Sequence, residues 1–323
     1  MAMSDEKYAG LAKNDWLTIH SVALTVIICS MMGSSYIIFR TLKSVWSSRS
    51  RAQFPVVGVL PCFLAIADFC FGTIHGLDHI LSLSQSHVTV GDACIAIGVI
   101  TNIFIIAPAF ISGYIAFFIW SVVVKEKTPT VGRYYWRTLL WCFGAPIALG
   151  LLQLAVGEIG QEKGWCGNRT YTGMLLFQTV ELLINIVVSS YLYWSIQRKL
   201  RKHLDEVLTG DTKEARKLQA TIRRLPAFIL VFIVQFTPWV VYTFASSAGD
   251  APVAVIVVVV AIVNGGGIAN AFAFRQLLET AERANREEAK SYDAVRSRSG
   301  PASGVAGQST LSTAISLEPV PIY

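Results

Sequence analysis

The sequence predicts an all-α membrane protein, a seven-transmembrane helix bundle with the N-terminus outside and the C-terminus inside. The 323-residue chain is 53% hydrophobic and 15% charged, which is far from the balance of a soluble domain. Its apolar residues form seven segments, and each reaches the ~20 residues needed to cross a ~30 Å hydrocarbon core. The predicted spans are 17–39, 55–82, 94–124, 136–156, 171–196, 224–246 and 251–274.

Basic residues between the spans set the orientation. Four segments hold 23 of the 27 Lys and Arg residues: 40–54, 125–137, 197–224 and the chain from Arg275. Loops rich in Lys and Arg stay on the cytoplasmic side, and an odd number of spans puts the termini on opposite sides. The net charge of +6 therefore indicates contact with anionic membrane lipid and no nucleic-acid partner.

The chain divides into four parts. We expect a short extracellular N-terminus (1–16), a seven-transmembrane domain (17–274), a cytoplasmic juxtamembrane helix (275–290) and a disordered cytoplasmic tail (291–323). The first 16 residues are polar and mixed in charge, so we expect no cleavable signal peptide.

The loop before the fifth span carries two extracellular signals. Of the six cysteines, only Cys94 and Cys166 fall at the outer membrane face. Because that compartment is oxidising, we predict a Cys94–Cys166 disulfide. The sequon that begins at Asn168 predicts N-glycosylation in the same loop.

Acidic residues inside spans are functional candidates, since an ionised carboxylate at the helix centre costs about 2.5–3.5 kcal/mol on insertion scales. Asp68 lies near the middle of the second span. Glu181 shares one face of the fifth span with Gln178 and Asn185, at spacings of three and seven. This stripe lines either a ligand cavity or a contact between helices.

Two histidines lie four residues apart at the outer end of the second span, on the stripe that includes Asp68. The spacing of His75 and His79 suits Zn²⁺, but the chain has five histidines and its seventh span has none. We therefore expect no metal site and no cofactor. The two side chains would instead meet a ligand or a loop at the rim of a cavity, where histidine ionisation would make binding depend on pH.

The sixth span contains a proline beside aromatic residues. Pro238 removes a backbone hydrogen bond and predicts a kink. Trp239 is either a pocket residue at this pivot or an aromatic of the membrane interface. The candidate ligand-binding residues are His75, His79, Asn102, Trp165, Gln178, Glu181, Asn185, Gln235, Trp239 and Tyr242.

Several motifs support a family resemblance. Residues 64–68 read Leu-Ala-Ile-Ala-Asp, 164–166 read Gly-Trp-Cys, and 264–270 form a Gly- and Asn-rich end to the seventh span. With the predicted disulfide, these motifs resemble G-protein-coupled receptors, in particular the cyclic-AMP-receptor-like branch. The resemblance covers about residues 15–285. The third span ends without Asp-Arg-Tyr and the seventh contains no Asn-Pro-x-x-Tyr, unlike rhodopsin-like receptors.

The resemblance implies a plasma-membrane receptor and no enzyme. It would bind an extracellular ligand and activate a heterotrimeric G protein by movement of the fifth and sixth spans. Asp68 would face the interior and join Asn264 or Asn270, around a sodium ion in one version of this hypothesis. The basic segment 197–224 would dock the G protein, although lipid phosphate is an alternative partner. The Ser and Thr residues of the tail would be targets of a receptor kinase and of arrestin-like proteins.

Two other classes compete with the receptor interpretation. A retinal protein needs a Schiff-base lysine in its last span, and residues 251–274 contain none. A membrane transporter of a small polar solute remains the alternative, although no internal repeat is evident. The outer loops carry only two cations, Lys163 and Arg169, which argues against a multiply charged phosphate ligand.

Overall fold

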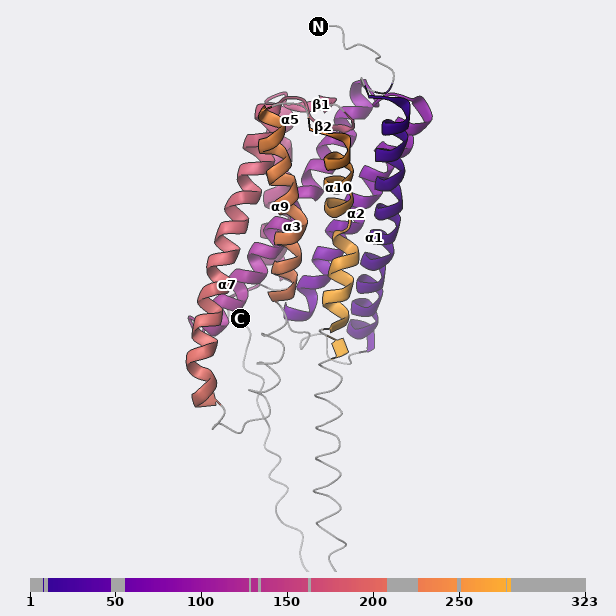
Figure 1. Ribbon diagram of the computed structural model, residues 1–323. Coiled ribbons are helices and arrows are strands. Elements are labelled where there is room, and N and C mark those ends of the chain that lie inside the picture. The colour runs from indigo at the N-terminus through magenta and orange to yellow at the C-terminus, as the bar shows by residue number, and fades with distance from the viewer. Residues whose placement is uncertain are drawn as a thin grey trace, which may run out of the picture.

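Long helices account for nearly all of the described chain and run side by side as one bundle (Figure 1). This computed structural model describes residues 8, 11–47, 56–127, 129–132, 135–161, 164–207, 226–248, 251–276 and 278–279. Lys163, the basic segment 208–225, residues 280–290 and the tail 291–323 lie outside the described residues, together with the predictions made for them.

The element order follows the predicted spans, with two single π-helical turns (η) and one short hairpin. The elements are α1 (Lys13–Ser47), α2 (Val56–Gln85), α3 (Gly91–Val123), α4 (Trp136–Leu139), η4 (Leu140–Gly144), α5 (Ala145–Ala155), β1 (Ile159–Gln161), β2 (Cys166–Asn168), α6 (Tyr171–Met174), η5 (Leu175–Thr179), α7 (Val180–Val207), α9 (Pro226–Ala248) and α10 (Val253–Asn264). A further helix, Gly266–Gln276, follows α10.

The predicted all-α bundle of seven membrane spans is confirmed, whereas the orientation of its termini stays a prediction. Within the described residues six helices are long and apolar enough to cross a membrane. The fourth is the continuous run of α4, η4 and α5, and the fifth is the run of α6, η5 and α7. The seventh span is the pair formed by α10 and Gly266–Gln276, which are bent by 41° at the break between them.

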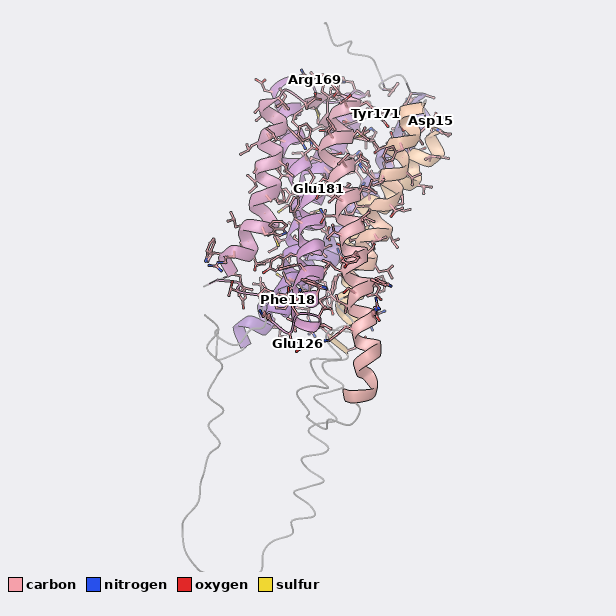
Figure 2. All side chains as sticks on the ribbon, turned by 90° about the vertical axis from the view of Figure 1, so that its left-hand side faces the viewer. Asp15, Phe118, Glu126, Arg169, Tyr171 and Glu181 are labelled. Atoms are coloured by element: carbon pink, nitrogen blue, oxygen red, sulfur yellow. A yellow bond between two sulfur atoms is a disulfide. The ribbon has the colours of Figure 1, made fainter. Side chains whose placement is uncertain are left out.

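The hairpin of β1 and β2 marks one end of the bundle, called here the hairpin end (Figure 1). The two strands are antiparallel, with Gly160 opposite Gly167. Arg169 lies at this end of the molecule, Glu126 lies near the opposite end, and Glu181 lies between them (Figure 2). The structure thus gives the bundle two distinct ends, one covered by the hairpin.

α3 is the central helix of the bundle. It contacts α2, α5, η4, α7, α9 and both strands of the hairpin. Of its 33 residues 17 are buried, and small ones such as Ala107, Ala109 and Ser112 allow neighbouring helices to approach closely. Because α3 is apolar around its whole circumference, it fits this interior position.

At the bend in the seventh span, two side chains replace one backbone hydrogen bond of the helix. In a continuous helix the amide of Gly267 would pair with the carbonyl of Val263. Here the Gly267 amide donates to Ser30 Oγ at 2.9 Å, and the Val263 carbonyl accepts from Gln235 Nε2 at 2.8 Å. Side chains from α1 and α9 therefore stabilise the bend, as membrane-buried backbone requires.

Candidate functional site

A small cavity lies beneath the hairpin, where five spans meet. Its lining consists of Phe71 and His75 from α2; Thr101, Asn102 and Ile105 from α3; Trp165, Cys166 and Gly167 from the hairpin; Gln178 from η5; Trp239 from α9; and Val260, Val263 and Asn264 from α10. Its volume is about 30 Å³, room for one or two water molecules. No residue of this lining carries a formal charge when histidine is neutral.

The hairpin is tied to the bundle above the cavity by two bonds at one residue. The expected disulfide joins Cys166 to Cys94 on α3. The backbone amide of Cys166 also donates to Asp78 Oδ2 on α2 at 2.8 Å, and the Asp78 side chain is fully buried. Gly98 on α3 lets the hairpin approach, because a Cβ atom there would lie 3.3 Å from the Gly167 amide. The hairpin that covers the cavity is therefore bonded to both α2 and α3.

Two carboxamides meet across the cavity. Gln178 Nε2 from η5 donates a hydrogen bond to Asn102 Oδ1 from α3. Both side chains are almost completely buried, at 4% and 1% exposed. The remaining atoms of the pair, Asn102 Nδ2 and Gln178 Oε1, have no hydrogen-bond partner in the part of the chain that the structure describes.

The predicted polar stripe of the fifth span is divided between two environments. Gln178 lines the cavity, whereas Glu181 and Asn185 do not. Asn185 Nδ2 donates to the Glu181 carboxylate, and its Oδ1 occupies the space that a Cβ atom on Gly113 would fill. Gln178 and Asn185 both face α3, at Asn102 and Gly113, so the stripe keeps one face and only its part near the hairpin reaches the cavity. Gln178 therefore fits the interpretation as a cavity residue, and Asn185 fits the interpretation as a contact between helices.

His75 and His79 belong to a chain of three histidine rings. His79 Nε2 lies 3.2 Å from His75 Nε2, and His79 Nδ1 lies 2.6 Å from His20 Nδ1 on α1. Only His75 lines the cavity. His79 is fully buried behind it, so its predicted place at the rim is wrong. His20 had no local sequence signal, since only the packing of α1 against α2 brings it to the other two.

The nitrogen atoms of the three histidine rings do not point toward one common position. Each nitrogen of His79 faces a different histidine, so neutral rings can share protons along the row. Within the described part of the chain no group of three His, Cys, Asp or Glu side chains is arranged to hold a metal ion.

Trp239 is a cavity residue of the sixth span. Its side chain is 6% exposed, which removes the alternative of a membrane-interface aromatic. Tyr242 packs against it with ring centroids 5.9 Å apart but lies outside the lining. Gln235 also lies outside the lining, at the bend of the seventh span. α9 continues through Pro238 as one helix.

Asp68 pairs with one of its two suggested partners. Asn270 Nδ2 donates to Asp68 Oδ2 at 2.8 Å, and both side chains are buried. Asn264 instead donates to the Val260 carbonyl within α10 and lines the cavity. The proposed polar core is thus divided, with Asn264 nearer the hairpin end.

Asn168 lies in a position that disfavours the predicted glycan. Its side chain is 2% exposed within β2, and both amide atoms are buried. A glycan attached to Nδ2 would require β2 to leave its place against α3. Glycosylation at this sequon therefore stays a prediction that the structure does not favour.

Sequence reasoning missed several lining residues. Those in the spans are Phe71, Thr101, Ile105, Val260 and Val263, and Gly167 is the one in the hairpin. Phe71 alone had a usable signal, because it precedes His75 by four residues and so shares its helical face. The other four span residues have no distinguishing sequence feature, and only helix packing separates them from residues that face lipid.

No protein-family model and no curated protein matches the sequence. Among solved structures, the crystal structure of squid rhodopsin matches with a TM-score of 0.67, at 15% sequence identity, over 85% of this chain and 85% of that chain. The fold is rhodopsin-like. At this identity the likeness concerns the fold, and the rhodopsin-like bundle here is formed by a chain without the Asp-Arg-Tyr and Asn-Pro-x-x-Tyr motifs.

Proposed function

We propose that this chain is a G-protein-coupled receptor of the plasma membrane, with its hairpin end and N-terminus outside the cell. One combination of features supports this most directly: a rhodopsin-like fold encloses a polar cavity beneath a disulfide-tethered hairpin. The sequence motifs favour the cyclic-AMP-receptor-like branch. The alternative of a transporter has no comparable support in the fold.

The mechanism we propose is a shift between two populated conformations. A ligand in the cavity would contact Trp239, and the next residue toward the opposite end is Pro238. The helix has no backbone donor at Pro238, so its two halves are less rigidly joined there. A ligand with higher affinity for the state in which α9 and α7 lie outward would favour that state by its difference in binding free energy.

The G protein would bind at the end of the bundle opposite the hairpin. There Lys199 on α7 pairs with Glu126, after α3, at 3.1 Å. Residues 208–225, which hold much of the basic third cytoplasmic loop, and the tail with its kinase and arrestin-type sites lie outside the described residues.

The stimulus we propose is a diffusible ligand. Rhodopsin-type light detection through a retinal Schiff base needs a lysine in the last span, and residues 251–276 contain none.

The test is nucleotide exchange on purified heterotrimeric G proteins in membranes that contain the full chain, measured with and without a small-molecule library. Exchange above that of empty membranes is expected. Trp239→Ala and Pro238→Ala, made separately and together, should change it. Trp141→Ala is the matched control, because Trp141 is 51% exposed on the outside of the bundle and does not line the cavity.

The opposite result would be no exchange with any G-protein class from protein shown to be folded and at the cell surface. That outcome would contradict the receptor proposal and favour the transporter, for which substrate flux is the next assay.

A further inference from the structure

The cavity lining contains six buried polar atoms that have no hydrogen-bond partner among the described residues. They are His75 Nδ1, Thr101 Oγ1, Asn102 Nδ2, Gln178 Oε1, Trp239 Nε1 and Asn264 Oδ1. Each of these side chains is more than nine-tenths buried. Buried polar groups are nearly always hydrogen-bonded, so six in one small cavity indicate a site for a polar occupant.

The Asn102–Gln178 pair presents a specific hydrogen-bonding edge. One bond joins the two carboxamides, which leaves one N–H donor and one C=O acceptor side by side. If the N and O atoms of both carboxamides are exchanged, one free donor and one free acceptor still remain side by side. The hydrogen-bonding edge is therefore the same in either orientation of the two amides. The matching group is one that offers an acceptor next to a donor, which is the edge of a carboxamide or a lactam.

The lining also selects for the absence of charge. A bound ion in this buried position would need an opposite charge. The lining supplies amide, hydroxyl, imidazole and indole groups but no carboxylate, lysine or arginine. Asp78 on α2, which accepts a hydrogen bond from the Cys166 amide, is not part of the lining.

Aromatic rings around the cavity favour a flat molecule. Phe71 stacks on His75 with centroids 5.1 Å apart, and Trp165 meets His75 edge-on at 6.4 Å. The Trp239 ring completes the aromatic part of the lining. Because the cavity volume is about 30 Å³, a ligand of several heavy atoms requires a lining side chain or the hairpin to move outward.

We propose that this cavity binds an uncharged, flat molecule whose carboxamide or lactam edge pairs with Asn102 and Gln178. The inference rests on the proposed function in so far as it treats the cavity as the ligand site of a receptor.

Two matched pairs of probes test it directly: nicotinamide against nicotinate, and indole-3-acetamide against indole-3-acetate. Thermal unfolding and equilibrium binding are measured on the full chain purified in detergent. The proposal requires that at least one amide raises the melting temperature in a dose-dependent way and that its acid does not. Equal stabilisation by the acids overturns the proposal. No stabilisation by either amide at millimolar concentration also overturns it and leaves water as the occupant of the cavity.

Variants distinguish binding of an amide in the cavity from binding elsewhere on the protein. Asn102→Asp keeps the size of the side chain but replaces the free donor with an anionic oxygen, so amide binding should weaken at least about tenfold. Asn14→Asp is the same substitution at an exposed position of α1 and should change nothing. If Asn102→Asp unfolds without ligand, Gln178→Glu provides the same test from the other half of the pair. Retained binding in the folded variant contradicts the proposal.

The assay also distinguishes the two proposals. Amide binding in a protein that never promotes nucleotide exchange would support the ligand class and refute the receptor. Ligand-dependent exchange in a protein that binds neither amide would support the receptor and refute the ligand class.

Discussion

Gly33 and Gly267 lie against each other where α1 meets the helix Gly266–Gln276. A Cβ atom on Gly33 would lie 2.5 Å from the carbonyl oxygen of Gly267. The side chains of Ser30 and Ser34 occupy the corresponding space beside Gly267, and the Gly267 amide donates to Ser30 Oγ. The seventh span can therefore bend here only because both helices carry small residues at the contact.

Substituting Gly33 tests this close approach. Gly33→Ala should destabilise the protein by about 1–3 kcal/mol, because the obstructing atom is backbone and cannot rotate away. The measurement is the melting temperature of the full chain in detergent. Gly76→Ala is the matched control, since a Cβ atom there would meet only Ile27 at 3.4 Å. Equal melting temperatures for the two variants would contradict the prediction.

The Asp68–Asn270 hydrogen bond should contribute to the stability of the bundle near the second and seventh spans. Asp68→Leu leaves the buried Asn270 amide without its acceptor, at a cost of about 1–3 kcal/mol. Asp68→Asn retains an acceptor oxygen and should cost less. Thermal unfolding of both variants decides the point, and a leucine variant as stable as the asparagine variant would show that the bond contributes nothing.

The histidine chain predicts an order of effects. His79→Leu removes a partner from both His20 and His75, whereas His20→Phe keeps a ring against Trp16 and removes one link only. Each buried ring nitrogen left unpaired costs about 1–3 kcal/mol, so the His79 variant should unfold at the lower temperature. His87→Phe serves as the control, because the His87 ring is not one of the three linked histidines. The reverse order would indicate that the rings pack without sharing protons.

The ion pair at the end opposite the hairpin should restrain the proposed activation. Glu126→Gln removes the partner of Lys199 and so favours separation of α7 from the end of α3. Because the pair is exposed, it is worth less than about 1 kcal/mol, and basal nucleotide exchange should rise less than about fivefold. Glu279→Gln breaks a similar exposed pair with Arg275 and should leave basal exchange unchanged. Unaltered exchange in Glu126→Gln would mean that the contact does not restrain α7.

The predictable parts of the site depend on residues close together in the sequence, whereas the unpredictable parts depend on contacts between distant residues. Cys94 and Cys166 could be paired from the sequence, because only these two cysteines were predicted to fall at the outer membrane face. Gln178 and Trp239 were candidates because a polar residue near an acid and an aromatic residue beside a proline stand out within an apolar span. The regular 3.6-residue period placed Gln178, Glu181 and Asn185 on one stripe, but it could not show that only Gln178 lies at the level of the cavity.

The sequence by itself determined the number of spans and their approximate ends. Both follow from the length of apolar segments, a one-dimensional property that the thickness of the bilayer selects. The tertiary structure alone decided that His20 joins His79, that Asp68 pairs with Asn270 and leaves Asn264 to the cavity, and that Asn168 is buried. Each of these depends on how helices rotate and approach, which in a membrane is set by close packing and hydrogen bonds between residues far apart in the chain.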